Sequence, residues 1–102
     1  MRSLNYDELY IGGRWQAPST GQRLSVISPH TEQSIGETPE AAPEDVDKAV
    51  TAARKAFDEG PWPRLSVSER MEKIERLAAI YLAETDAIAD LITAEMGSPK
   101  SF

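Results

Sequence analysis

The chain of 102 residues is long enough for one small domain, and its 40% hydrophobic and 27% charged residues exclude a disordered tail. Its net charge of −6, from 17 acidic against 11 basic residues, repels phosphate groups and anionic lipid, so we expect no nucleic-acid and no membrane partner. The absence of cysteine excludes disulfides, thiolate metal sites and a thiol nucleophile among these residues.

The N-terminal residues carry charges where a targeting segment would be apolar. Asp7 and Glu8 interrupt the region in which a secretory signal peptide needs its hydrophobic run. No apolar stretch of the sequence approaches the ~18 residues that argue for a membrane span. We therefore expect a soluble protein of the cytoplasm.

Residues 1–40 predict β-strands joined by turns. The stretches LYI and RW flank Gly12 and Gly13, and paired glycines readily adopt the positive φ angles of a two-residue hairpin turn. The stretches RLSVIS and QSIGE flank PHTE and predict a second hairpin, with Leu24 and Val26 on one face. We expect a β-hairpin region here.

A helical period begins at about residue 41. Apolar residues recur every three or four positions and define one helical stripe, formed by Val46, Ala49, Val50, Ala53 and Phe57. We expect this stripe to be buried. Pro43 suits the first helical position, whereas Ala42, at the expected N-cap, offers no side-chain acceptor. Gly60 and the prolines that follow it are expected to end the helix.

Two further helices are predicted in residues 66–97. Ser66 and Glu69 form a capping box, in which each side chain accepts a hydrogen bond from an otherwise unpaired backbone N–H. The apolar stripe of this helix widens towards its end, which indicates burial on more than one side. Thr85 is expected to cap the third helix and Gly97 to terminate it. The residues expected to face inward on it are Ile88, Leu91, Ile92 and Met96. Two hairpins followed by three helices make an α+β fold, with residues 41–102 as its helical region.

Few residues of the sequence point to chemistry. His30 is the only histidine, and without a second histidine or any cysteine nearby we interpret it as a solvated turn residue. No helix start follows Gly12 and Gly13, so a hairpin turn is favoured over a phosphate loop. One acidic cluster lacks the ligand spacing of a calcium loop, and we interpret it as a solvated helix start: Glu37, Glu40, Glu44, Asp45 and Asp47. No nucleophile is paired with a base, so we assign no catalytic residue.

Four stretches resemble the N-terminal part of the NAD(P)-dependent aldehyde dehydrogenase superfamily. They are LYIGGRW (9–15), VISPHTEQSIGETPEA (26–41), PEDVDKAVTAARKAFDEGPW (43–62) and SERMEKIERLAAIYLAETDAIADLITAEMGSP (68–99). The third is the most specific, because it is similar to the helix of that family almost residue for residue. The resemblance covers roughly residues 9–100 in matching order.

The resemblance implies a place for each part of the chain. In that family the first hairpin belongs to the oligomerisation structure, which implies a homo-oligomer, and the helices pack outside an α/β Rossmann-like coenzyme-binding domain. The family uses a cysteine nucleophile, a glutamate-activated water and an oxyanion-binding asparagine, with NAD or NADP as hydride acceptor. The matching positions all lie beyond residue 102. We therefore expect one incomplete domain with no catalytic or cofactor-binding residue, and no coenzyme bound by this chain alone.

The resemblance also implies one metal site. Several family members hold a monovalent cation with backbone carbonyls before an Asn-Pro turn and with a carboxylate near the end of the third helix. The matching positions are Val26, Ile27 and Glu95. Here Ser28 replaces the usual asparagine, and HTEQ replaces a glycine-containing turn.

Three hypotheses for the function follow. The first is an N-terminal segment of an aldehyde dehydrogenase, non-catalytic alone, whose partner is a second copy or the rest of the dehydrogenase. The second is a complete small α+β interaction module that binds a protein through Trp15 or Trp62, which would otherwise anchor loops to the core. The third is a non-catalytic partner of a full-length dehydrogenase.

Overall fold

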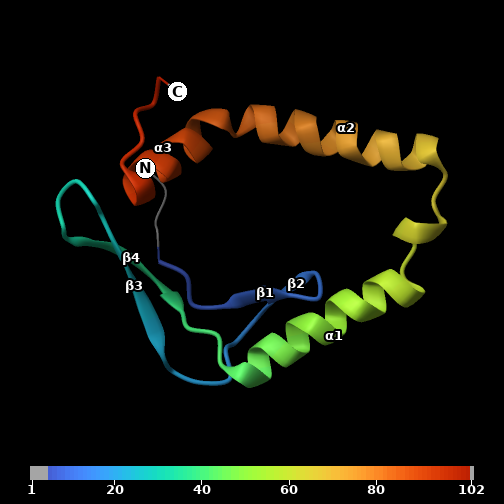
Figure 1. Cartoon of the computed structure of the whole chain (residues 1–102), viewed down its shortest axis with the longest axis horizontal. Helices are drawn as coiled ribbons and strands as arrows, with labels where there is room; N and C mark the ends of the chain where they lie inside the picture. The colour runs from blue at the N-terminus through green and yellow to red at the C-terminus, as the bar shows by residue number, and fades with distance from the viewer. Residues whose placement is uncertain (1–4, 102) are drawn as a thin grey trace.

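The computed structural model describes residues 5–101. Two antiparallel hairpins precede three helices, and Figure 1 shows these elements arranged around an open ring, with α1 and α2 on opposite sides. The strands are β1 (Leu9–Ile11), β2 (Arg14–Gln16), β3 (Arg23–Ile27) and β4 (Ser34–Pro39). The helices are α1 (Pro43–Glu59), α2 (Val67–Ala83) and α3 (Thr85–Met96), with a 3₁₀ turn at Trp62–Arg64. The predicted α+β fold is confirmed.

The first hairpin has the predicted two-residue turn. Strands β1 and β2 pair with Tyr10 opposite Trp15 and Ile11 opposite Arg14. Gly12 and Gly13 connect them with φ angles of 64° and 82°. Positive φ at both central positions matches the right-handed twist of the strands, which explains why glycine stands at both.

The second hairpin carries an irregularity that matters for the site described below. Strand β3 pairs with β4, with Val26 opposite Gly36, but the register shifts between Val26 and Ile27 so that Ile27 lies opposite Ser34. Such a bulge leaves one residue of the longer strand unpaired and disrupts the local ladder. The shift falls at the last residue of β3, two positions before Pro29.

The start of α1 is tied to the loop after the first hairpin by a buried carboxylate. Asp45 is only 2% exposed. Its carboxylate accepts hydrogen bonds from the Ala42 amide at 2.9 Å, from the Ser19 amide at 3.0 Å and from the Ser19 hydroxyl at 2.9 Å. The interpretation of Asp45 as a solvated helix-start acid is therefore wrong. Ala42 has no side-chain acceptor, so Asp45, the third residue of α1, accepts the hydrogen bond from the Ala42 amide. The other two donors come from Ser19, 26 positions earlier in the chain.

Replacing Asp45 with asparagine is expected to release this loop. The bond from the Ala42 amide outweighs burial and, with those from Ser19, lowers the pKa of Asp45. The stabilisation is therefore present above the unfolded-state pKa and is lost as pH falls through the lower folded-state pKa. Amide proton shifts of Ser19 and Ala42 should titrate with a midpoint below the ordinary aspartate value, and Asp45→Asn should speed their hydrogen exchange several-fold.

The matched control is Asp47→Asn, which removes an exposed carboxylate from the same helical turn. It should leave the exchange rates of both amides unchanged. A titration midpoint at the ordinary aspartate value, or equal effects of the two substitutions, would contradict the role assigned to Asp45.

The predictions for the starts of α2 and α3 have different outcomes. Glu69 N–H donates to the Ser66 hydroxyl at 3.1 Å and Ser66 N–H donates to the Glu69 carboxylate at 2.8 Å, so the capping box is confirmed. Thr85 does not cap α3, because its hydroxyl donates backwards to the Leu82 carbonyl at 2.9 Å. Only Glu84 separates α2 from α3, so the hydroxyl satisfies the unpaired carbonyls at the end of α2 instead.

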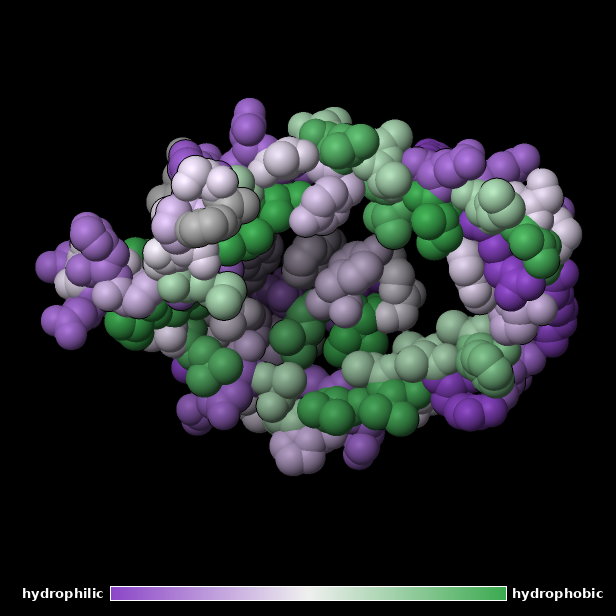
Figure 2. All heavy atoms as spheres, turned by 45° about the horizontal axis from the view of Figure 1, so that its top comes forward, coloured by the Kyte–Doolittle hydropathy of each residue, from purple (hydrophilic) through white to green (hydrophobic). Residues whose placement is uncertain are grey.

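Among the described residues no aliphatic or aromatic side chain is buried, and the buried residues are Ser28, Gly36, Pro39 and Asp45. The accessible surface is 8118 Å², whereas a folded monomer of this mass exposes about 5,700 Å². The radius of gyration is 17.1 Å, against about 13 Å for a compact chain of this length. Figure 2 shows hydrophobic residues gathered along the hollow between the two sides of the ring.

The predicted burial of the helical stripes is therefore wrong for this chain. We call the following exposed side chains the apolar rows: Val46, Val50 and Phe57 on α1, Val67, Met71, Ile74 and Leu77 on α2, and Ile92 and Met96 on α3. Trp62 is also exposed, so it anchors no loop to a core. The periodicity placed these residues on common faces correctly, but residues 5–101 supply nothing that buries those faces.

Candidate functional site

Catalytic side chains do not gather anywhere in the part of the chain that the structure describes. Within residues 5–101, no group of three His, Asp or Glu side chains is close enough to hold a metal ion. His30 lies exposed in the turn after β3, where its backbone amide donates to the Ser28 hydroxyl at 3.2 Å. No helix among these residues is both long and apolar enough to cross a bilayer. With no catalytic or metal-binding cluster among these residues, the remaining candidates for a binding site are the cavities of the structure.

One cavity of about 300 Å³ lies where the second hairpin meets α3. Its lining residues are Tyr6, Val26, Thr38, Leu91 and Glu95. Val26 and Thr38 come from the two strands of one hairpin, while Leu91 and Glu95 lie one helical turn apart on α3. Residues more than 50 positions apart in the sequence thus line the same cavity, because the tertiary fold brings the second hairpin next to α3.

The end of α3 brings Glu95 to this cavity. Gly97 ends the helix with φ 74° and donates its amide to the Thr93 carbonyl at 2.9 Å. A Cβ atom at Gly97 would lie 3.3 Å from Pro29, tighter than most contacts, so glycine serves both the turn and the close approach to the end of β3. The Thr93 hydroxyl donates to the Ser98 carbonyl at 2.8 Å and holds the chain beyond the helix.

The structure brings together two of the three residues predicted to hold a cation. Val26 and Glu95 line the same cavity, and Ile27 does not. The register shift falls between Val26 and Ile27, at the backbone positions expected to supply carbonyl ligands. Glu95 is the only charged side chain in the lining and takes part in no hydrogen bond or ion pair within the described residues.

Sequence reasoning missed three lining residues of this cavity. Tyr6, Thr38 and Leu91 follow no metal-binding pattern, because an aromatic ring, a hydroxyl and an alkyl side chain are not a ligand set. The alternation of side chains along β4 assigns Thr38 to one face of that strand, and the 3.6-residue period of α3 assigns Leu91 to one face of that helix. No signal in the sequence pairs those faces with Tyr6.

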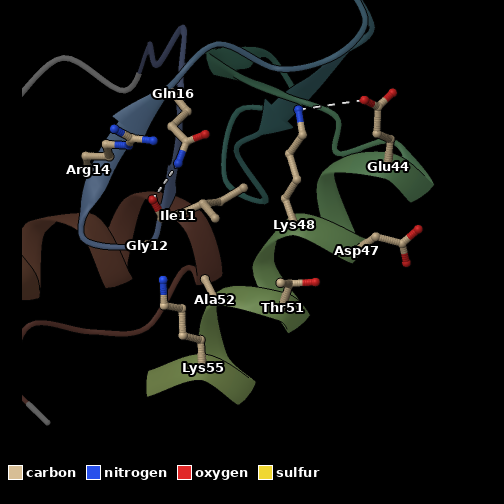
Figure 3. A pocket seen from close by; sticks show the side chains of 10 residues that line it. All are labelled: Ile11, Gly12, Arg14, Gln16, Glu44, Asp47, Lys48, Thr51, Ala52 and Lys55. Atoms are coloured by element: carbon tan, nitrogen blue, oxygen red, sulfur yellow. Dashed lines mark hydrogen bonds and ion pairs between the residues drawn. The ribbon is translucent and has the colours of Figure 1, made fainter. Parts of the chain in front are cut away.

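A larger groove lies between the first hairpin and α1. Figure 3 shows that Gly12 and Arg14 overhang a helix face from which Lys48 and Lys55 project, and the volume is about 650 Å³. Lys48 lies 3.7 Å from Glu44. This open groove contains both basic and acidic side chains, and no nucleophile meets a base in it, so it has no catalytic arrangement.

A neighbouring groove of about 720 Å³ shares Ile11, Gly12, Ala52 and Lys55 with the first. Small side chains of α1 form its floor, namely Ala49, Ala52, Ala53 and Ala56, and Gly60 closes its end. The methyl groups of these alanines provide a packing surface and have no polar atom that could bind or activate a substrate. Both grooves therefore shape the contact between hairpin and helix.

Comparisons with known proteins match nearly the whole chain. The model of the aldehyde dehydrogenase family matches residues 15–102. A 3-succinoylsemialdehyde-pyridine dehydrogenase of a Pseudomonas species is 41% identical over 93% of this chain and 20% of its own length. A betaine aldehyde dehydrogenase of Oryza sativa subsp. japonica is 43% identical over 89% of this chain and 19% of its own length.

Solved structures agree with these sequence relatives. The crystal structure of a Mycobacterium tuberculosis aldehyde dehydrogenase in complex with NAD⁺ superposes with a TM-score of 0.91 at 41% identity. It covers 98% of this chain, which in turn covers 21% of that protein. The chain thus spans about a fifth of the length of the relatives it matches.

Proposed function

The chain belongs to the aldehyde dehydrogenase family, and from this premise we propose that it is the N-terminal segment of an enzyme that oxidises an aldehyde to a carboxylic acid. NAD or NADP is the hydride acceptor of that parent enzyme, and the segment alone binds neither coenzyme and performs no catalysis. The absence of catalysis rests on the chemistry that the 102 residues lack, since they include no cysteine to attack the carbonyl carbon.

The uncovered apolar rows are the observation that carries the proposal. The chain exposes roughly 2,400 Å² more surface than a compact monomer of its mass. Much of the exposed surface comes from large apolar side chains on helix faces, and exposed apolar faces of this kind mark a missing partner. A complete small interaction module would bury a core of its own, so the second hypothesis is not favoured. The remainder of the dehydrogenase is the cover that we propose.

We propose the following division of the segment. Residues 1–40 contribute strands to the oligomerisation structure of a homo-oligomer, and residues 41–102 form outer helices of the coenzyme-binding domain. We also propose that the parent is a cytoplasmic protein. Two plant relatives bear names that place them in mitochondria, so fractionation of the source cells tests this assignment.

A monovalent cation site at Val26, Ile27 and Glu95 is part of the proposal. The shared cavity of Val26 and Glu95, the bulge beside Ile27 and the unpaired Glu95 carboxylate support it. A single carboxylate with backbone carbonyls suits a singly charged ion better than a divalent one, which usually gathers several carboxylates or waters. The ion would join the end of β3 to α3, so potassium should stabilise the parent protein and not its Glu95→Gln variant.

The test of the function is the reading frame that follows the codon for Phe102. We expect the frame to continue into a region with a glycine-containing coenzyme loop and a cysteine. The encoded protein should then reduce NAD⁺ or NADP⁺ in the presence of an aldehyde, whereas the purified 102-residue chain should not. A stop codon directly after Phe102, or aldehyde oxidation by the chain alone, would contradict the proposal.

A further inference from the structure

The apolar rows of α1 and α2 stay apart although each could cover the other. Among residues 5–101, α1 packs on β1 and on the 3₁₀ turn and α2 packs on α3, but α1 and α2 share no comparable contact. The molecule measures 48 × 37 × 16 Å, and Figure 1 shows the two helices on opposite sides of its open ring. Packed helices lie about 8–10 Å apart, and such packing removes apolar surface from water. The open ring therefore needs a restraint that keeps the two helices from meeting.

Residues 60–66 join α1 to α2, and we call them the linker. The Arg64 guanidinium donates to the Gly60 carbonyl at 2.5 Å and to the Asp58 carbonyl at 2.9 Å. The Arg64 amide donates to the Pro61 carbonyl at 2.9 Å. Carbonyls at the end of a helix lack intrahelical partners and carry a partial negative charge, so a cation is favourable there. Arg64 therefore ties the linker back to the end of α1.

The backbone of the linker has little freedom of its own. The proline ring restricts φ, and Pro61 and Pro63 place two such restrictions in the linker. A Cβ atom at Gly60 would lie 2.2 Å from the Ala56 carbonyl oxygen, so the chain leaves α1 along a path that fits glycine and no larger residue. A guanidinium that connects this short, stiff segment to α1 can therefore set the direction in which α2 leaves.

We propose that Arg64 is a positioning residue that fixes the linker and so holds the apolar rows of α1 and α2 apart, in the arrangement that the rest of the parent enzyme binds. This inference rests on the proposed function. A chain with a loose linker spends part of its time with α2 folded onto α1, where the two rows cover each other. The rest of the parent binds only the open form, so its apparent affinity falls with the fraction of open chain. Arg64 raises that fraction.

The first test measures the distance between α1 and α2 in single molecules of the 102-residue chain. The chain has no cysteine, so two dyes can be attached specifically at Asp47→Cys and Lys73→Cys, both at exposed positions. We expect a main population at long distance and, in Arg64→Ala, a growth of the short-distance population of roughly three- to tenfold, the effect of losing about one net hydrogen bond. Arg76→Ala removes the same charge from an exposed position of α2 and should leave the distribution unchanged.

The second test measures assembly with the rest of the parent enzyme. The chain is mixed with the remaining polypeptide, so that the recovery of NAD(P)H formation gives the association rate and the loss of activity after dilution gives the dissociation rate. Contacts across an interface act mainly on dissociation, whereas the population of the binding-competent form acts on association. Arg64→Ala should slow association roughly three- to tenfold and leave dissociation unchanged. Arg64→Lys keeps the charge without the fork of donors and should give an intermediate rate.

The two tests separate the inference from the function on which it rests. If Arg64→Ala and Arg76→Ala give the wild-type distance distribution, or if Arg64→Ala changes the distances but associates at the wild-type rate, the inference is wrong and the proposed function stands. Faster dissociation of Arg64→Ala with unchanged association would make Arg64 an interface contact and also overturn the inference. If the wild-type chain restores no activity, the proposed function is wrong and the role of Arg64 in docking falls with it.

Discussion

The isolated 102-residue chain is expected to sediment as a dimer or a larger species, to bind a hydrophobic dye and to melt without a cooperative transition. Its accessible surface is 8118 Å² and the described residues bury no aliphatic or aromatic side chain, so little hydrophobic free energy opposes the loss of chain entropy on folding. Association of the apolar rows removes part of this surface from water. Sedimentation velocity across a concentration series measures the effect.

Two substitutions on α2 separate apolar association from a general effect of charge. Met71 is 57% exposed within the apolar rows, and Met71→Lys adds one positive charge there. Glu72→Gln changes the net charge by the same amount on a neighbouring exposed position. We expect Met71→Lys to increase the fraction of monomer strongly. Glu72→Gln should leave the proportions of monomer and larger species unchanged. A wild-type chain that remains monomeric at high concentration and unfolds cooperatively would contradict the explanation.

The second large effect is the recovery of activity when the chain meets the rest of its parent enzyme. Neither the 102-residue chain nor the remaining polypeptide alone is expected to oxidise an aldehyde, and co-expression of the two should restore NAD(P)H formation from a background of zero. The excess exposed surface of roughly 2,400 Å² far exceeds the about 800 Å² that each partner buries in an interface of standard size. Such an area suits a permanent, largely apolar interface.

The same pair of variants tests this recovery. Met71→Lys places an ammonium group in the interface and should reduce the recovered activity at least tenfold, because an unpaired buried charge is costly. Glu72→Gln should recover activity like the wild type. Full activity of the remaining polypeptide without the chain would show that these helices are dispensable and would overturn the assigned role.

Local signals determined the elements correctly where one or two residues suffice. Gly12 and Gly13 specify the first turn through their positive φ angles, and Ser66 with Glu69 specifies the start of α2. Gly97 ends α3 in the left-handed conformation, as predicted. These devices act within four residues of the chain, so neighbouring side chains determine their outcome.

The same local reasoning failed for Asp45, whose partner lies far away in the sequence, and for Thr85, whose role depends on where the preceding helix ends. Asp45 has the position of a solvated helix-start acid, yet Ser19 from a distant loop makes it a buried acceptor. Thr85 has a residue type common at N-caps, yet the close succession of two helices turns its hydroxyl back to α2. Ser19 lies 26 positions from Asp45 and cannot be identified from its neighbours, whereas the Leu82 carbonyl lies only three residues before Thr85 and is available because α2 ends there.

By itself the sequence determined the two hairpins, the three helices, the helical faces that carry apolar residues and the resemblance to a family. Only the tertiary structure decided that those faces stay uncovered, that Val26 and Glu95 share a cavity, and that Tyr6 completes its wall. The physical reason is one of range. Turns, caps and periodicity depend on hydrogen bonds and dihedral angles within a few residues, whereas burial and cavity walls depend on which distant surfaces meet in space.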